Sequence, residues 1–288
     1  MHDGNVALAV FHIVDMKLVL FVNDSYFAFL LAEPVLRRYH DQVSLIVLSG
    51  KNKTSLARMR SIGTKASPQY FLYRSAVQGF SLLLGATRGQ SVAAAARRYG
   101  IPALHASDFR ASMPDIERSG PFDVGLAFNC DQKIDERLLG LCSRGILNVH
   151  ASKLPQDAGI SPVLWAFARG DETVWSTIYK MDAGVDTGPI LEQIEMRVQT
   201  DDTAFSLYER VCAQSGAALA GALTRYLGGD LEPLPQQHNG NRSYWSWPDA
   251  RHQRLMKESG RKYLRIRDIV RTALRGEPAP NPLQPSSL

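Results

Sequence analysis

The sequence predicts an α/β fold in which a mostly parallel, Rossmann-like sheet is flanked by helices and followed by a small C-terminal appendage. Short apolar runs of strand composition alternate with longer segments of helical periodicity, the pattern of parallel strands joined by crossover helices. The chain has 288 residues, of which 45% are hydrophobic, so it can bury a sizeable core. No Gly-x-Gly-x-x-Gly sequence follows the first apolar run, so a dinucleotide site is not indicated.

The elements can be placed in chain order from composition and periodicity. Arg37-Arg38 suits the C-terminal dipole of the first helix, Thr203 offers an N-cap for the last, and Gly228-Gly229 ends that helix. Residues 50–66 are polar and are expected to form a loop or a short helix. Strands are expected at 17–22, 43–48, 100–104, 123–128, 146–150, 174–181 and 190–198, and helices at 26–39, 69–84, 90–99, 135–141, 162–169 and 203–227.

Four parts of the chain are predicted. Residues 1–15 form an N-terminal extension, because Met16 offers a natural start directly before a buried strand. Residues 16–229 form the main, catalytic domain. Residues 230–275 form a small basic subdomain after a proline-containing linker, and residues 276–288 form a disordered tail.

Composition restricts the setting in which the protein works. Cys130, Cys142 and Cys212 have neither metal-ligand spacing nor a disulfide framework, which favours a reducing, cytoplasmic compartment. No run of eighteen uncharged apolar residues occurs, so no membrane span and no membrane partner are predicted. No metal site is expected either.

Two polar side chains stand on one short apolar strand, Ile146-Leu-Asn-Val-His150. Asn148 and His150 are two residues apart and therefore point to the same face, at the carboxyl end of the strand where α/β sheets bind ligands. An amide can donate to a developing oxyanion, and an imidazole can carry a proton. Further along, Asp186 lies in the glycine-bracketed segment 182–188, whose glycines allow a tight loop that could return a carboxylate to this pair.

Together these segments resemble the N10-formyltetrahydrofolate-dependent formyltransferases. That family has the approximate pattern N-[IV]-H-x-S-x-L-P-x-x-x-G followed by D-x-G-x-D-[TS]-G, and residues 148–159 and 182–188 match it. The family includes glycinamide ribonucleotide transformylase, methionyl-tRNA formyltransferase and the sugar N-formyltransferases. The resemblance covers residues 123–227 closely and implies a formyltransferase fold with Asn148, His150 and Asp186 as the catalytic residues.

The resemblance also implies N10-formyltetrahydrofolate as formyl donor. By position, Gln132 and Ile134 on one side and Asp182 and Val185 on the other are expected to contact the pterin. The chain departs from the usual pattern at Lys153, at Trp175-Ser176 and in the segment 129–132. No substrate-binding residue can be assigned.

Several acceptors and activities stay open. A primary amine on a small molecule, such as a nucleotide-linked amino sugar, ranks first, because few residues follow Gly229 compared with the C-terminal domain of methionyl-tRNA formyltransferases. A tRNA acceptor ranks second and is supported by basic side chains at Arg267, Arg271 and Arg275, although a solvated helix face explains them as well. Ile266, Ile269, Val270, Ala273 and Leu274 share another face of the same predicted helix.

Two further alternatives are a formyltetrahydrofolate hydrolase and a binding protein that keeps the fold without the chemistry. The oligomeric state is open, with a homodimer as one alternative.

Overall fold

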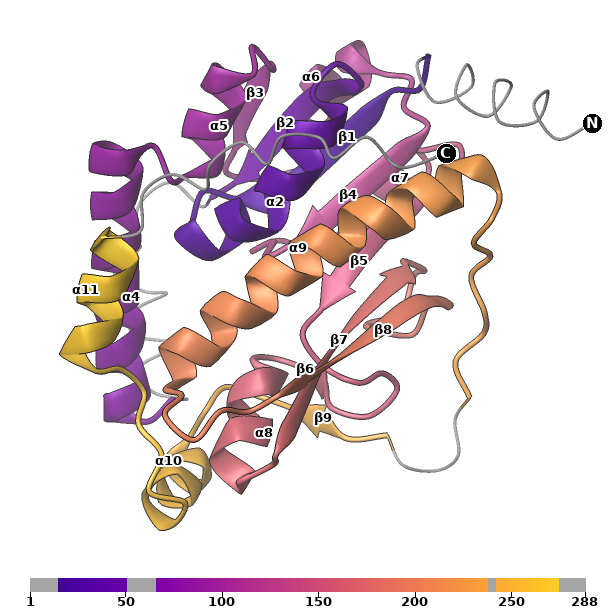
Figure 1. Ribbon diagram of the computed structural model, residues 1–288. Helices are drawn as coiled ribbons and strands as arrows, with labels where there is room; N and C mark the ends of the chain where they lie inside the picture. The colour runs from indigo at the N-terminus through magenta and orange to yellow at the C-terminus, as the bar shows by residue number, and fades with distance from the viewer. Residues whose placement is uncertain (1–14, 51–65, 238–241, 275–288) are drawn as a thin grey trace, which may run out of the picture.

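A computed structural model describes residues 15–50, 66–237 and 242–274 of the chain and shows a layered α/β arrangement (Figure 1). The elements in chain order are β1 (Leu18–Asn23), α2 (Tyr26–Tyr39), β2 (Val43–Ser49), α4 (Pro68–Arg88), α5 (Val92–Arg98), β3 (Ala103–Ala106), α6 (Met113–Ser119), β4 (Val124–Phe128), α7 (Glu136–Leu139), β5 (Ile146–His150), β6 (Ala158–Gly159), α8 (Pro162–Arg169), β7 (Thr173–Lys180), β8 (Ile190–Arg197), α9 (Ala204–Gly228), β9 (Tyr244–Trp245), α10 (Ala250–Glu258) and α11 (Ile266–Leu274).

The main sheet has seven strands in the order β3-β2-β1-β4-β5-β7-β8. The five strands from β3 to β5 run parallel, and β7 and β8 add an antiparallel edge. The predicted fold class, a mostly parallel sheet flanked by helices, is therefore confirmed. Parallel strands bring their carboxyl ends to one edge of the sheet, which is where such folds bind ligands.

Both faces of the sheet are buried. Leu18, Leu20 and Val22 of β1 point into a core shared with α2, α5, α8 and α9, whereas Val19 and Phe21 point into a second core against α6 and α7. This alternation explains why the strand is apolar at every position from Leu18 to Val22. Figure 1 shows α9 running across one face of the sheet beside α2.

Both ends of helix α9 are capped, and its middle packs closely against α2. Thr203 caps its N-terminus in a reciprocal capping box with Ser206, and Gly229 ends it in a left-handed conformation, as the sequence predicts. At Gly216 an added Cβ would collide with the backbone of Leu30 and Leu31, so glycine permits the close approach of α9 to α2.

The described C-terminal residues pack against the main sheet domain. Strand β9 pairs with β6, and Trp245 stacks on Trp165 of α8 with ring centroids 4.7 Å apart. His252 of α10 is fully buried, with Nδ1 2.9 Å from the Tyr263 hydroxyl and Nε2 3.0 Å from the Leu164 carbonyl oxygen. The predicted division at residues 229/230 stays a prediction, and these contacts tie residues 242–274 to the sheet.

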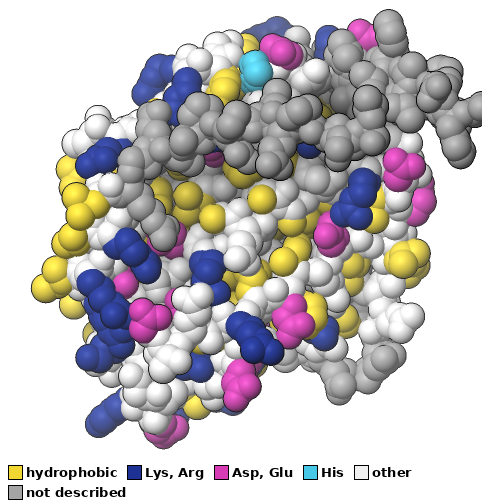
Figure 2. Space-filling model, viewed as in Figure 1, with side chains coloured by type: hydrophobic (Ala, Val, Ile, Leu, Met, Phe, Trp, Pro, Cys, Tyr) yellow, Lys and Arg dark blue, Asp and Glu magenta, His cyan; other side chains and the backbone are white. Residues whose placement is uncertain are grey.

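Helix α11 faces the protein with polar side chains. Asp268 and Thr272 are buried and bind Thr203 and Glu209, while the apolar residues Ile266, Val270 and Leu274 are exposed. Figure 2 shows apolar side chains at the left edge of the view, where Figure 1 places α4 and α11. The apolar stripe seen in the sequence is thus the outer face of the helix, because buried acidic groups take the inner one.

The predicted arginine stripe is partly engaged within the chain. Arg267 bonds to the Asp201 carbonyl and carboxylate, and Arg271 lies 3.5 Å from a Glu209 carboxylate oxygen. Arg275 lies outside the described residues. Two of the three arginines thus contact acidic residues of the chain, and the choice between a solvated helix face and a tRNA-binding stripe stays a prediction.

Some boundaries differ from those expected. Helix α4 runs to Arg88, and α6 is not predicted by the sequence because it has only seven residues, one of them a proline, and buries only Met113 and Ile116. The strand predicted at 100–104 is shifted to Ala103–Ala106. The expected extension 1–15 and tail 276–288 lie almost wholly outside the described residues, as does most of 50–66. In the part of the chain that the structure describes, no helix is long and apolar enough to cross a membrane.

We predict that acidification weakens the fold through His252. Burial lowers the pKa of this imidazole to about 4, whereas an unfolded histidine titrates near 6.5. The unfolded state therefore binds the proton first, and stability is lost as the pH falls from about 6.5 towards 4, by up to about 3 kcal/mol. Urea denaturation between pH 7 and pH 4.5 measures this slope.

Comparison with two variants isolates the contribution of His252. His252→Gln is less stable at pH 7 and has a shallower dependence of stability on pH, whereas His105→Gln, at an exposed position of β3, keeps the original slope. An unchanged slope in His252→Gln contradicts the assignment.

Candidate functional site

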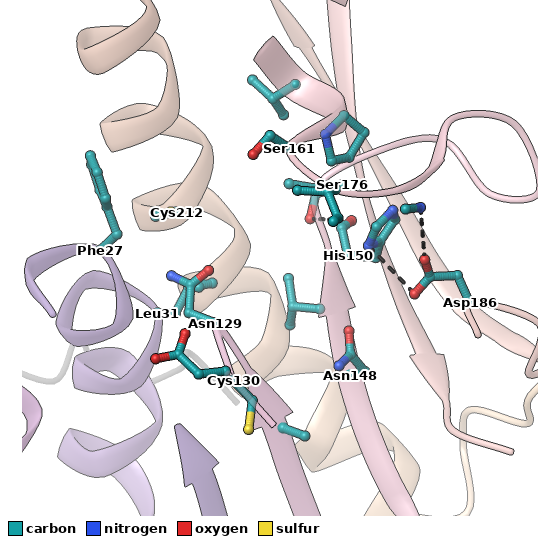
Figure 3. Close-up of a pocket in the computed structure, with 18 of the residues that line it drawn as sticks. Phe27, Leu31, Asn129, Cys130, Asn148, His150, Ser161, Ser176, Asp186 and Cys212 are labelled. Atoms are coloured by element: carbon teal, nitrogen blue, oxygen red, sulfur yellow. Dashed lines mark hydrogen bonds and ion pairs between the residues drawn. The ribbon is translucent and has the colours of Figure 1, made fainter. Parts of the chain in front are cut away.

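The site starts at the carboxyl end of β5. Asn148 and His150 emerge on the same side of this strand, as the period of two predicts, and are partly buried (Figure 3). The Asn148 amide nitrogen contacts the Met181 sulfur at 3.9 Å, and a thioether is a weak acceptor. The amide therefore keeps donor capacity for a ligand.

The loop after β7 carries the third polar group. The Asp182 carboxylate accepts hydrogen bonds from the Gly184 amide at 3.0 Å and from the Thr187 hydroxyl at 2.6 Å, which closes a tight turn. Asp186 has φ 54°, a conformation rare for residues other than glycine. An added Cβ at Gly188 would collide with the Lys180 carbonyl oxygen, so glycine is required there. Asp182 shapes the loop that presents Asp186.

Three groups surround the Asp186 carboxylate. Its Oδ2 accepts from the Gly159 amide at 3.0 Å, and its Oδ1 accepts from the Tyr179 hydroxyl at 3.1 Å. The same Oδ1 lies 3.6 Å from His150 Nδ1 (Figure 3). Burial, together with the adjacent Asp186 carboxylate, raises the pKa of Tyr179, so its hydroxyl stays a donor. The carboxylate is therefore held in one orientation beside the imidazole.

Both nitrogens of His150 face oxygen acceptors. Nδ1 faces Asp186, and Nε2 lies 3.3 Å from the Asp157 carbonyl oxygen. A doubly protonated ring can donate to both, so this arrangement suits a histidine that carries and releases a proton. The side chains of His150 and Asp186 are only 11% and 12% exposed, which strengthens the interaction between their charges.

The strand pair β6 and β9 supports the site from behind. Gly159 has φ 101°, and a Cβ there would collide with the Trp245 carbonyl oxygen. The neighbouring Asp157 side chain accepts from the Trp245 indole and from Arg169, whose guanidinium also binds Asp171. Residues 157 and 159 thus connect the C-terminal segment to both His150 and Asp186.

The side chains of Asn148, His150 and Asp186 line one wall of a cavity of about 670 Å³. Figure 3 shows Asn148, His150, Ser176 and Asp186 on this wall, with Phe27, Leu31, Asn129 and Cys130 on the opposite side. The volume is in the range of sites for cofactors and small substrates. Among the described residues no cluster of three or more His, Cys, Asp or Glu could hold a metal ion.

The expected pterin contacts are brought together only in part. Gln132, Ile134 and Val185 line the cavity, whereas Asp182 is not among its lining residues. The Gln132 side chain accepts from the Phe109 amide and donates to the Ala106 carbonyl, both at 2.8 Å, so it anchors its segment to the end of β3.

Sequence reasoning missed one contributor to the site, Tyr179, and one contact outside the cavity. Tyr179 reads as an ordinary strand residue, and its role depends on pairing between β5 and β7. Lys153 and Trp175, which both depart from the pattern noted above, contact each other, with the ammonium 4.1 Å from the ring centroid. Their joint departure is the signal that could have indicated a contact.

Comparison with known proteins agrees with this geometry. Residues 105–223, which include Asn148, His150 and Asp186, match the family described as Formyl transferase. This match covers less than half of the chain. The part that matches contains β4, β5, β7 and β8 and most of α9, the elements that build the site.

Curated proteins similar to this chain include a methionyl-tRNA formyltransferase of Myxococcus xanthus, 35% identical over 143 residues, or 49% of this chain and 46% of the relative. One from Acidithiobacillus ferrooxidans is 32% identical over 164 residues, or 57% and 51%. The chain thus spans about half the length of the curated relatives it matches.

Solved structures with the formyltransferase fold are also similar. A sugar 3N-formyl transferase, crystallised with dTDP and 5-N-formyl-THF, has a TM-score of 0.55 and 18% identity and covers 80% of this chain and 69% of its own. Glycinamide ribonucleotide transformylase 1 from Symbiobacterium toebii has a TM-score of 0.53 and 18% identity, with coverage of 76% and 94%. At these identities the likeness shows the fold alone.

We predict that Gly159→Ala weakens both the fold and the support of Asp186. The new methyl group meets the Trp245 carbonyl in a left-handed backbone conformation, so unfolding free energy falls by about 2 to 4 kcal/mol. Gly79→Ala is the matched control, because a Cβ there meets no atom and alanine favours the α4 helix by up to about 1 kcal/mol. Equal stability of the two variants in urea contradicts this account.

Proposed function

We propose that this chain transfers a formyl group from N10-formyltetrahydrofolate to a primary amine of a small molecule. The observation that carries the proposal is the meeting of Asn148, His150 and Asp186 on one wall of a cavity large enough for a cofactor. Relatives with this fold are enzymes of formyl transfer, and one was crystallised with a formylated tetrahydrofolate. Ile134 and Val185 on the cavity wall offer apolar surface to the pterin ring.

The donor supplies the activated formyl group, and the protein supplies position and charge. The Asn148 amide is free to donate to the formyl oxygen, which gains negative charge as the amine attacks; one such donor contributes roughly 3 to 4 kcal/mol. A protonated His150 adds positive charge close by. Asp186 holds His150 in place and can take up the amine proton directly or through water.

The second part of the proposal concerns the identity of the acceptor amine. A nucleotide-linked amino sugar is supported by the named neighbours of the same fold, one of them an N-formyltransferase from Helicobacter canadensis in complex with dTDP-3-aminofucose. A methionyl-tRNA acceptor is supported by the curated relatives, all at partial coverage. The ion pairs of Arg267 and Arg271 within the chain favour the small molecule.

We predict that Asn148→Ala, His150→Ala and Asp186→Asn each lower formyl transfer by about 100-fold or more in kcat, because each removes charge stabilisation or proton transfer at the reacting carbonyl. The measurement is release of tetrahydrofolate from N10-formyltetrahydrofolate in the presence of aminated sugar nucleotides. His105→Ala, a histidine outside the cavity, serves as control and keeps full activity.

The same assay separates the alternatives. Formate release without any amine indicates a hydrolase, and turnover only with charged initiator tRNA indicates the second acceptor. Ligand binding without turnover indicates a protein without the chemistry. Undiminished turnover in Asn148→Ala and His150→Ala contradicts the proposed mechanism.

We further predict a smaller effect for Tyr179→Phe. Removal of one hydroxyl leaves Asp186 with the Gly159 amide and His150, so its orientation loosens but its charge stays. One hydrogen bond is worth about 1 kcal/mol, and kcat should fall about five- to tenfold with KM unchanged. A rise in KM alongside the fall in kcat indicates instead that Tyr179 contacts the substrate.

A further inference from the structure

We propose that Arg74 on α4 binds a phosphoryl group of the acceptor and so determines which amines the enzyme accepts. The inference rests on the proposed function, and it assigns the substrate class of the same cavity. It concerns the wall opposite Asn148 and His150, formed by α2, α4, α9 and the ends of β1 and β4.

Arg74 is an exposed cation that lines this cavity without an ion-pair partner in the described ranges of the chain. Most arginines near the site are engaged: Arg169 binds Asp157 and Asp171, and Arg210 binds Asp202. A guanidinium that faces a ligand cavity and has no carboxylate partner is suited to a phosphoryl group, which matches its fork of donors.

A second donor lies on the same wall. Asn129, at the end of β4, has φ 45°, and its Oδ1 accepts a hydrogen bond from the Tyr208 hydroxyl at 2.9 Å. Because burial raises the pKa of Tyr208, that hydroxyl stays protonated and holds the amide in one orientation. The oxygen of Asn129 is thereby occupied, and its NH₂ group is left to donate to a ligand.

Two buried polar atoms along this wall have no hydrogen-bond partner among the described residues, which indicates that a bound ligand supplies one. Ser215 is 1% exposed and lines the cavity, and its Oγ has no hydrogen-bond partner in the described part of the chain. Asn23 Oδ1, at the end of β1, is buried and unpartnered in the same way. An unsatisfied buried polar atom is unfavourable for the folded protein, and hydroxyl or amide groups of a bound molecule can supply the missing hydrogen bond.

Arg74 offers positive charge on this wall to an anion, and the field of the nearby Asp131 carboxylate reaches its guanidinium. Lys133 lies between the expected pterin contacts Gln132 and Ile134 and is not assigned to this wall. A phosphorylated acceptor and the glutamate carboxylates of the folate donor share this anionic chemistry. The assignment to the acceptor follows from the position of Arg74 on α4, outside the segment 132–134 and the loop 182–186 that hold the expected pterin contacts Gln132, Ile134 and Val185.

The test uses inorganic pyrophosphate and 5-formyltetrahydrofolate as separate probes in calorimetric titrations of the full chain at low salt. Arg74→Gln is expected to weaken pyrophosphate binding at least about tenfold, and Arg74→Lys less, because it keeps the charge but loses the fork. Arg88→Gln, which removes the same charge from the same helix outside the cavity, stays within about twofold of the parent chain. None of the three variants changes the affinity for 5-formyltetrahydrofolate.

Three results overturn the inference: no pyrophosphate binding by the parent chain, equal binding by Arg74→Gln and Arg88→Gln, or a loss of 5-formyltetrahydrofolate affinity in Arg74→Gln. If no formyl transfer occurs but pyrophosphate binding depends on Arg74, the proposed function fails and this inference stands. The failure of the proposed function and the failure of the inference are therefore distinguishable.

Discussion

The site depends on the fixation of the Asp186 carboxylate between the Gly159 amide and the Tyr179 hydroxyl. A carboxylate on a surface loop would ordinarily sample several rotamers and be screened by water. Here two donors from different segments hold it, and the imidazole of His150 stands beside it in a largely buried setting. Preorganised charge of this kind is effective because no reorganisation is needed during the reaction.

This fixation requires the C-terminal segment. The backbone position of Gly159 is set by the pairing of β6 with β9, and β9 is held by the stacking of Trp245 on Trp165. The Asp157 side chain joins the same aromatic contact, while its carbonyl faces His150. Residues 242–274 therefore support the site through packing, and Tyr244 and Trp247 also line the cavity.

The strand-and-loop core of the site could be predicted from sequence because it depends on local rules. A period of two places Asn148 and His150 on one side, and glycine at positions 184 and 188 allows the turn that presents Asp186. The orientation of α11 could not be predicted, because its inner face is determined by contact with the buried Glu209 of α9, which is far away in the sequence. Long-range partners of that kind leave no periodic signal.

The residues of the opposite cavity wall could not be predicted from sequence motifs either. Arg74 stands on a helix whose composition is unremarkable for a surface element, and only the fold brings it to the cavity. Motif positions report the chemistry that the family shares. Selection among acceptors is expected to lie outside them, in elements such as α4, which stands outside the matched residues 105–223.

The central claim is that Asp186 acts through His150 and not as an independent group. A double-mutant cycle on kcat with His150→Ala, Asp186→Asn and the double variant measures this coupling. The account predicts strong non-additivity, with the double variant no slower than His150→Ala alone. Multiplication of the two single effects in the double variant would show that the carboxylate and the imidazole work separately, and it would contradict the account.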